Sequence, residues 1–278
     1  MFATRAFFLC FVLYFFPFLT AEESGVFLHY PSGMKVFQTF ETQVEMESEL
    51  PVMTWNEWIK QKIFAELTFF SEGREGEQPS QGVEVVLKRV IVELRANNRE
   101  KRMDTDDANS SFEFVQLEKV MGRPFFFRLD SDNLLGNSDS LTELEKAFPS
   151  IGSVMGMETF SEMFFYLFIL KNKELFAGKK VKGGKETDID INRVDSQEVQ
   201  VSFGRRLERK ELEFSGGNRA VLGGVLSGTG SWKSENALFY KSKIHQSISG
   251  DLYRGEAVVP IRMKIIQWIN AIPLNLSH

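Results

Sequence analysis

VEVVLKRVIVELR, residues 83–95, is dense in β-branched side chains and predicts a long strand. Residues 33–47 before it alternate between apolar and polar side chains, as a half-buried strand requires. One side of that alternation holds Met34, Val36, Phe40, Val44 and Met46, and the other holds Lys35, Thr39, Glu41, Gln43, Glu45 and Glu47. Both stretches therefore predict a sheet with one buried face.

Residues 55–70 fit two periods. A capping box at Thr54-x-x-Glu57 and apolar residues spaced by four from Trp55 favour a helix. Alternation from Ile59 to Phe69 favours a strand that pairs with 83–95. We favour the strand.

The middle of the chain, about 110–176, reads as a helical insert. Capping boxes at Ser110-x-x-Glu113 and Ser140-x-x-Glu143 predict helices that end near Gly122 and Phe148, and a third helix is expected over about 156–170. A strand over 123–130 lies between the first two helices.

The chain then returns to strands, which we expect over 197–204, 207–214, 219–232, 236–248 and 252–265, with turns at 215–218 and 249–251. Pro260 implies a sheet edge or a bulge. The sequence thus predicts an α+β fold: a large curved antiparallel β-sheet, half-barrel-like, with two or three helices inserted mid-chain and packed on one face.

Residues 1–21, MFATRAFFLCFVLYFFPFLTA, have the pattern of a secretory signal peptide, with Arg5 before an apolar core and Ala21 at the cut site. The apolar core is short for a spanning helix, although an uncleaved N-terminal membrane anchor is the alternative. Residues 22–278 would then form a single β-rich domain.

Composition narrows the setting further. The net charge of −5 argues against nucleic-acid binding, which needs a basic surface. Cys10 is the only cysteine, so removal of the signal leaves no disulfide. We expect an exported protein, periplasmic or secreted, in a bacterial envelope, with at most peripheral membrane contact.

The sequence lacks the motifs of known chemistry. His29, His245 and His278 have no metal-ligand spacing, and the Asp-x-Asp pairs at 104 and 188 lack the remaining positions of a calcium loop. No nucleophile elbow or zinc-protease helix occurs. We expect no enzyme, no cofactor and no metal, although a hydrolase that uses paired carboxylates stays open as a minor alternative.

Aromatic residues carry the strongest functional signal. Met163–Leu170 is apolar on every side, so it must be buried all round or cover something apolar. These side chains form either a sealed core or the lining of an apolar cavity. The candidate ligand-binding residues are Phe160, Phe164, Leu167, Phe168 and Trp232.

This layout of long strands around a helical insert, behind a signal peptide, resembles the half-barrel proteins that carry lipoproteins and other exported β-rich domains of bacterial envelopes. The resemblance implies a greasy cavity that binds acyl chains, gated by the helix 156–170. We therefore expect a non-enzymatic binding module that carries a lipid or an acylated protein. The alternative is an envelope structural or interaction protein that binds a protein partner and no small ligand.

Overall fold

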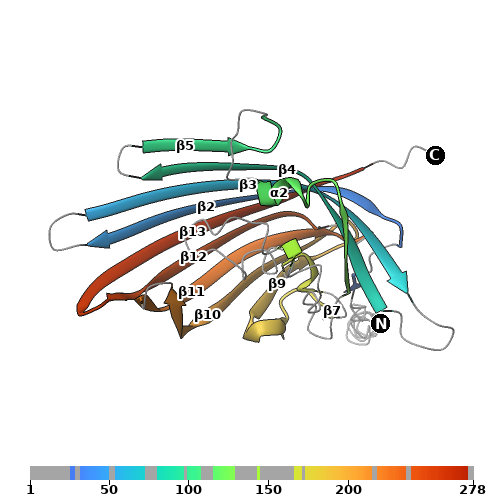
Figure 1. Cartoon of the computed structure of the whole chain (residues 1–278). Coiled ribbons are helices and arrows are strands. Elements are labelled where there is room, and N and C mark those ends of the chain that lie inside the picture. Colours follow the sequence, from blue (N-terminus) through green and yellow to red (C-terminus); the bar gives the residue numbers. More distant parts are fainter. Residues whose placement is uncertain are drawn as a thin grey trace, which may run out of the picture.

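Most of the chain forms one large antiparallel sheet (Figure 1). The computed structural model describes residues 26–28, 32–49, 54–72, 80–96, 99–107, 115–128, 143–144, 166–170, 173–214, 218–235 and 239–274.

In chain order the elements are β1 (Val26–Phe27), β2 (Lys35–Glu49), β3 (Thr54–Glu72), β4 (Ser80–Ala96), β5 (Arg99–Asp104), α2 (Val115–Glu118), β6 (Pro124–Arg128), β7 (Glu174–Leu175), β8 (Lys180–Lys182), η2 (Gly184–Glu186), β9 (Asp188–Val194), β10 (Glu198–Phe214), β11 (Asn218–Lys233), β12 (Phe239–Arg254) and β13 (Ala257–Pro273).

The main sheet has 11 strands in the order β5-β4-β3-β2-β13-β12-β11-β10-β9-β8, and β6 pairs with β4. Two antiparallel meanders, β2–β5 and β8–β13, are joined where β2 pairs with β13. The first long strand and the last strand of the chain are therefore neighbours in the middle of the sheet. β1 and β7 form a separate two-stranded sheet.

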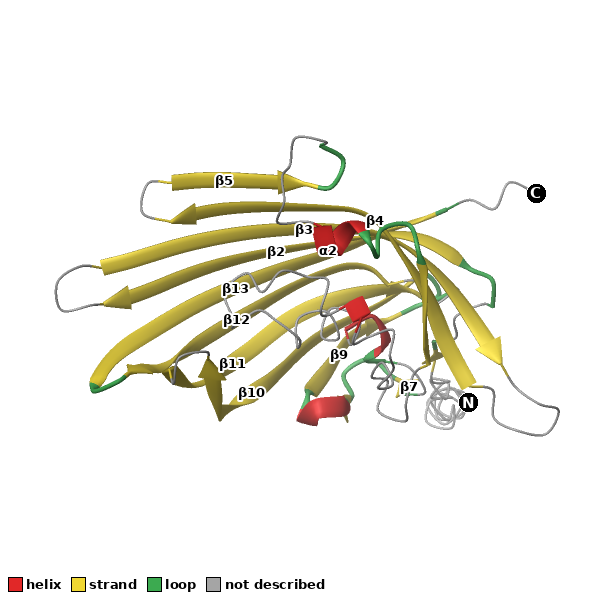
Figure 2. Ribbon diagram, in the orientation of Figure 1, coloured by secondary structure: helices red, strands yellow, loops and turns green. Residues whose placement is uncertain are grey.

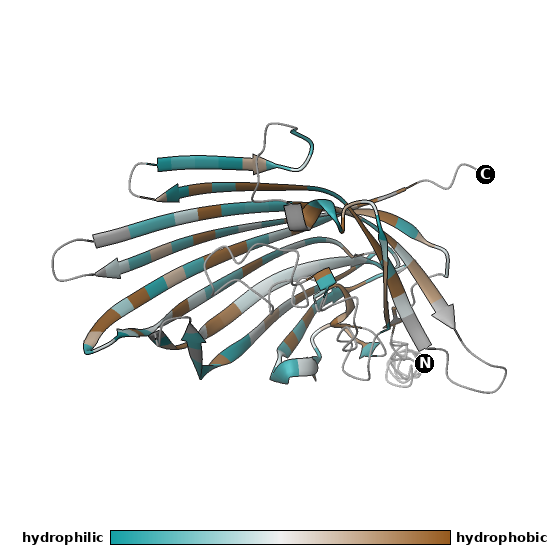
Figure 3. Cartoon of the chain, in the orientation of Figure 1, coloured by the Kyte–Doolittle hydropathy of each residue, from teal (hydrophilic) through white to brown (hydrophobic). Residues whose placement is uncertain are grey.

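Alternation along the strands separates two faces (Figure 3). We call the buried face concave, because the sheet curves around it (Figure 1), and the opposite face convex. Bulges interrupt the register at Lys88 of β4, opposite Phe64 and Ala65 of β3, and between Leu207 and Lys210 of β10. Such bulges increase local twist and bend a strand, which suits a sheet built from strands this long.

Short segments cover one end of the concave face. Leu117 and Val120, at and just after α2, belong to the main core cluster together with Phe125 and Phe127 of β6. Residues 166–170 join the same cluster, each at most 1 % exposed. We call this the filled end.

The other end of the concave face has its own small cluster. Ala220 and Leu222 of β11 lie with Ile261 and Met263 of β13, and their packing partners in the cluster also come from strands of the sheet. We call this the strand end.

The prediction of two or three helices packed on one face is wrong. Within the described residues, α2 has four residues, η2 is a single 3-10 turn, and the remaining helical positions are 143–144 and 166–168 (Figure 2). Gly122, with φ +73°, ends the turn after α2 as expected, and β6 begins two residues later. The other predicted helical positions, 110–114, 140–142, 145–148 and 156–165, lie outside the described residues.

Helix signals in the local sequence were overridden where strand pairing in the sheet competed with them. Residues 55–70 form β3, paired with β4 as predicted, because alternation buries one side against the sheet core. A helix there would lose those pairings. Residues 197–204 and 207–214 belong to one strand, β10, since its pairing with β11 continues without a break from Gly204 to Leu207. β5 was not predicted.

The predicted turn at 249–251 is also wrong. The chain reverses instead at Gly255, which has φ +58°. Gly250 lies inside β12, where a Cβ would sit 1.9 Å from the carbonyl oxygen of Val221. That glycine is required for close strand approach and not for a turn. Pro260 does lie at a local edge, one residue past the pairing of β13 with β2.

Candidate functional site

Three of the predicted ligand-binding residues meet at the filled end. The indole Nε1 of Trp232 donates to the carbonyl oxygen of Leu167 at 3.3 Å, and Phe168 packs edge-on against Phe69 with ring centroids 5.9 Å apart. Tyr166 stacks on Phe203 of β10 at 5.2 Å. Segment 166–170 thus contacts both meanders.

These three residues are packed as core. Trp232, Leu167 and Phe168 are each at most 1 % exposed. Phe160 and Phe164 lie outside the described residues. Ligand binding by these five residues stays a prediction.

Further along the concave face, three uncharged polar side chains lie side by side on three adjacent strands. Thr42 of β2 is paired with Gln61 of β3 on one side and with Gln267 of β13 on the other. Their exposed fractions are 1 %, 8 % and 3 %. We call these three residues the polar row.

One buried atom of the polar row lacks a hydrogen-bond partner among the described residues. The Gln267 Oε1 atom is fully buried and accepts no hydrogen bond there. Other polar side chains on the same face are satisfied: Gln38 donates from Nε2 to the Asn270 carbonyl at 2.8 Å, and Ser242 donates from Oγ to the Thr229 carbonyl at 2.7 Å. Since nearly all buried polar groups in proteins are paired, an unpaired amide marks the row as unusual.

Apolar rows flank the polar row on both sides. Ile63, Phe40 and Ile269 lie toward the filled end, in register across β3, β2 and β13. Ile59, Val44 and Ile265 form the next row toward the strand end. On β3, β2 and β13 the polar row is therefore a band of hydrogen-bonding groups between apolar rows, and on β12 the buried Gln246 lies beside Ile265.

Glycines remove side chains from the concave face of β11. A Cβ at Gly228 would meet the Phe203 ring at 2.6 Å, and one at Gly230 would meet the Trp232 ring at 2.7 Å. The strand interior glycines therefore admit aromatic rings, in agreement with the close packing that such residues indicate.

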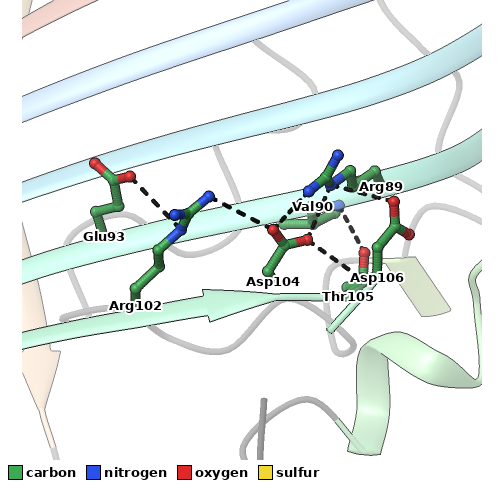
Figure 4. A network of polar contacts seen from close by, with 7 residues as sticks. All are labelled: Arg89, Val90, Glu93, Arg102, Asp104, Thr105 and Asp106. Carbon is green, nitrogen blue, oxygen red and sulfur yellow. Dashed lines mark hydrogen bonds and ion pairs between the residues drawn. The ribbon is translucent and has the colours of Figure 1, made fainter. Parts of the chain in front are cut away.

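A charged network on the convex side joins β4 to β5 (Figure 4). Arg89 donates from Nε and Nη2 to the two carboxylate oxygens of Asp104 at 2.9 and 2.7 Å, and Asp106 lies 3.2 Å from the same guanidinium. Hydrogen bonding to Arg89 holds the pKa of the Asp104 carboxyl below its ordinary value. This paired carboxylate fixes β5 and is not poised as an acid or base.

A second polar cluster lies where β10 and β12 approach. The Tyr240 hydroxyl donates to the Glu198 carboxylate, which also accepts from Gln200 Nε2 at 2.8 Å. The hydroxyl lowers the pKa of Glu198, while burial, with Glu198 itself, raises the pKa of Tyr240. The Tyr240 hydroxyl and the Glu198 carboxylate are thus paired with each other and join β12 to β10.

An open groove of about 390 Å³ runs along β9 and β10, lined by Asp188, Asp190, Ser202, Phe203, Gly204, Arg205 and Arg206. Both aspartates are already paired, Asp188 with Lys182 and Asp190 with Lys180. The acids therefore neutralise the short edge strand β8 and leave no free ligand pair.

Among the described residues, no group of three or more His, Cys, Asp or Glu side chains could hold a metal ion. His245 is exposed on the convex face. No helix within the described ranges has the length and hydrophobicity to cross a bilayer.

The polar row escaped sequence reasoning, although a signal for it existed. Thr42 falls on the apolar side of the alternation in 33–47, and Gln61 does the same within Ile59–Phe69. Gln267 continues the alternation two residues past the predicted end of the last strand. Polar residues on an otherwise apolar parity were the clue.

Comparisons with known proteins add little. No family model matches the chain, and no curated protein matches its sequence. A crystal structure from Nitrosomonas europaea, of a protein provisionally named AttH, aligns at 8 % identity with a TM-score of 0.19. The alignment covers 87 % of this chain and 53 % of that one, and so low a score carries no argument. The β-rich architecture is present, whereas the match to a lipoprotein carrier is not.

Proposed function

We propose that the protein is an exported, non-enzymatic module that carries an apolar ligand, such as a lipid or the acyl chain of an acylated protein, on the concave face of its sheet. The observation that supports this most is the concave face itself. It is mostly apolar across β3, β2, β13 and β12, apart from Gln38, the polar row, and Ser242 and Gln246 of β12, and it extends from the filled end to the strand end.

Ligand sites in proteins are concave and mostly apolar, with a few placed polar groups. The concave face has this character, with the polar row inside it. The two charged clusters built around Asp104 and Glu198 are internally paired, which favours a binding role over hydrolysis by paired carboxylates. The signal-like residues 1–21 support export.

The test is lipid extraction of the purified protein, followed by uptake of a pyrene-labelled long-chain ester monitored by fluorescence. We expect a co-purifying apolar molecule or saturable uptake. A Met263→Trp variant should reduce uptake several-fold, because it fills the strand end of the concave face. Lys264→Trp, the next residue on the exposed convex face, is the matched control.

Absence of both a co-purifying apolar molecule and uptake would contradict the carrier function. Thermal melting by circular dichroism shows whether each variant is folded. Export is tested separately: the mass of full-length protein produced in a bacterial host should reveal cleavage after Ala21.

A second function, protein interaction without a small ligand, is favoured by one sheet edge. Residues 205–214 of β10 continue past the last pairing with β9, at Gly204, and within the described residues pair only with β11. Such an edge can accept another strand. Cross-linking from a photoreactive residue at Glu213, which is exposed, should then capture one dominant protein partner.

A further inference from the structure

The polar row specifies more than an apolar ligand. Its three side chains come from adjacent strands, which lie about 4.8 Å apart, so their polar atoms span roughly 10 Å. Two amides and one hydroxyl offer both donors and acceptors within that span. The complementary group on a ligand must likewise donate and accept hydrogen bonds.

Two other polar side chains on the concave face do have partners. Gln38 and Ser242 share the concave face and are satisfied by backbone carbonyls of neighbouring strands. Gln267 is 3 % exposed, so bulk water does not supply the missing donor to its Oε1 atom. The Gln267 amide is therefore held by its strand on the concave face, and its Oε1 atom can accept a hydrogen bond from a ligand.

Charge selects against ionic head groups. The polar row and the two rows that flank it hold no ionisable side chain on β3, β2 or β13. The nearest ionisable residue on the concave face of those strands is Glu57, two rows toward the strand end, which is itself an anion. A buried anion without a cationic partner is strongly disfavoured.

The direction of an apolar chain also follows. Toward the filled end, the concave face is occupied by segment 166–170. Toward the strand end, the rows beyond Ile59, Val44 and Ile265 continue with Met46 and Met263, which belong to the cluster formed by strands alone. The apolar chain would lie in that direction.

We infer that the polar row binds the neutral, hydroxyl-bearing head of a single-chain lipid of the monoacylglycerol class, with Gln267 Oε1 accepting from a ligand hydroxyl. The inference rests on the proposed carrier function and adds the chemistry of the head group. The hydrocarbon chain lies over the apolar rows that lead to Met263.

The test compares three probes at pH 8 by native mass spectrometry of the full chain: monopalmitoylglycerol, palmitate and hexadecane. We expect monopalmitoylglycerol to bind at least tenfold more tightly than either of the others. Gln267→Leu and Thr42→Val should each lower its affinity about tenfold and leave hexadecane binding unchanged. Both substitutions nearly preserve volume, and melting curves check that the variants fold.

Gln43→Leu is the matched control, because Gln43 follows Thr42 on β2, faces the convex side and donates to Glu45. It should leave all three affinities unchanged. If the three probes bind equally, or if palmitate binds best, the head-group inference is overturned while the carrier function stands. Unchanged monopalmitoylglycerol binding in Gln267→Leu and Thr42→Val would show that the row holds only water. If no probe binds, the carrier function itself fails.

Discussion

The two faces of the sheet treat polar side chains in opposite ways, and the contrast is sharpest where β2 meets β3. On the convex face, Glu41 lies 2.7 Å from Lys60 Nζ and 2.9 Å from Lys62 Nζ. On the concave face, the residues that follow Glu41 and Lys60 in sequence, Thr42 and Gln61, are paired in register. Next to Thr42 lies Gln267, whose Oε1 atom accepts no hydrogen bond among the described residues. The convex groups are satisfied by ion pairing, whereas the concave face leaves the Gln267 amide oxygen without a donor, although it satisfies Gln38 and Ser242.

A polar group that is buried without a partner destabilises the fold by about 1–3 kcal/mol. The convex pairs are half-exposed and contribute little either way. The difference indicates that the Gln267 amide is not there for stability. Substitutions at neighbouring residues that face opposite ways can test this.

The largest effect is expected at tryptophan. Trp232 is fully buried on the concave face, so Trp232→Ala should lower the free energy of unfolding by about 3–5 kcal/mol. Trp268 is half-exposed on the convex face under Lys243, and Trp268→Ala should cost about 1 kcal/mol. Urea denaturation measures both values, and equal losses would contradict the assignment of the two faces.

The next effect concerns neighbouring glycines of β11. A Cβ at Gly224 would lie 2.1 Å from the carbonyl oxygen of Ser247, which is backbone and cannot move aside. Gly224→Ala should therefore cost about 1–3 kcal/mol. At Gly223 the nearest atom is the side-chain Cγ of Arg209, at 2.9 Å, so Gly223→Ala should cost less. Thermal melting gives the order, and a larger loss at Gly223 would reverse it.

Asp104 is a buried polar group with a partner, so its substitution shows how much such a paired group contributes to stability. Its side chain is 8 % exposed and accepts two hydrogen bonds from Arg89, so Asp104→Asn should cost about 1–2 kcal/mol at pH 7. Because the pKa of Asp104 is lower in the folded than in the unfolded state, its contribution is complete above the ordinary value of 3.8. The contribution is lost as the pH falls through the lowered pKa.

Denaturation of both proteins between pH 7 and pH 2 checks this dependence. The stability difference between wild type and Asp104→Asn should shrink below about pH 4. A constant difference over the whole range would show that the Asp104 carboxylate is not the source of the stability. Asp106→Asn, at an exposed neighbour of the same guanidinium, is the control and should change stability little.

The sheet could be predicted from sequence where a strand alternates cleanly. Alternation identified β2 and β4, and it separated Glu41 from Val44 correctly, because the side chains of a strand point to opposite faces. The mid-chain helices failed because capping boxes are local signals, and the described parts of this region, such as Leu117 and residues 166–170, are packed in the core of the sheet. Residues 166–170 are buried on all sides rather than along one stripe.

Glycine shows the same limit. The turn signal at 249–251 is in the wrong place: Gly250 allows close approach to Val221 of the neighbouring strand, and Gly255 makes the turn. The polar row depends on register in the same way. Thr42 and Gln267 are far apart in sequence, and only the pairing of β2 with β13 places them side by side.

The smallest stability effect separates the two faces most directly. Gln267→Leu removes a buried amide oxygen that lacks a donor, so it should raise the free energy of unfolding by about 1 kcal/mol. Gln43→Leu removes an amide that donates to Glu45 on the convex face, and it should change stability by less than about 0.5 kcal/mol. Urea denaturation resolves a difference of this size when both variants share the wild-type slope.

A destabilised Gln267→Leu would mean that the amide is satisfied within the folded protein, and the contrast between the faces would then be lost. A stabilised variant that also binds monopalmitoylglycerol more weakly would show that the polar row is kept at the expense of stability, as expected of a binding site.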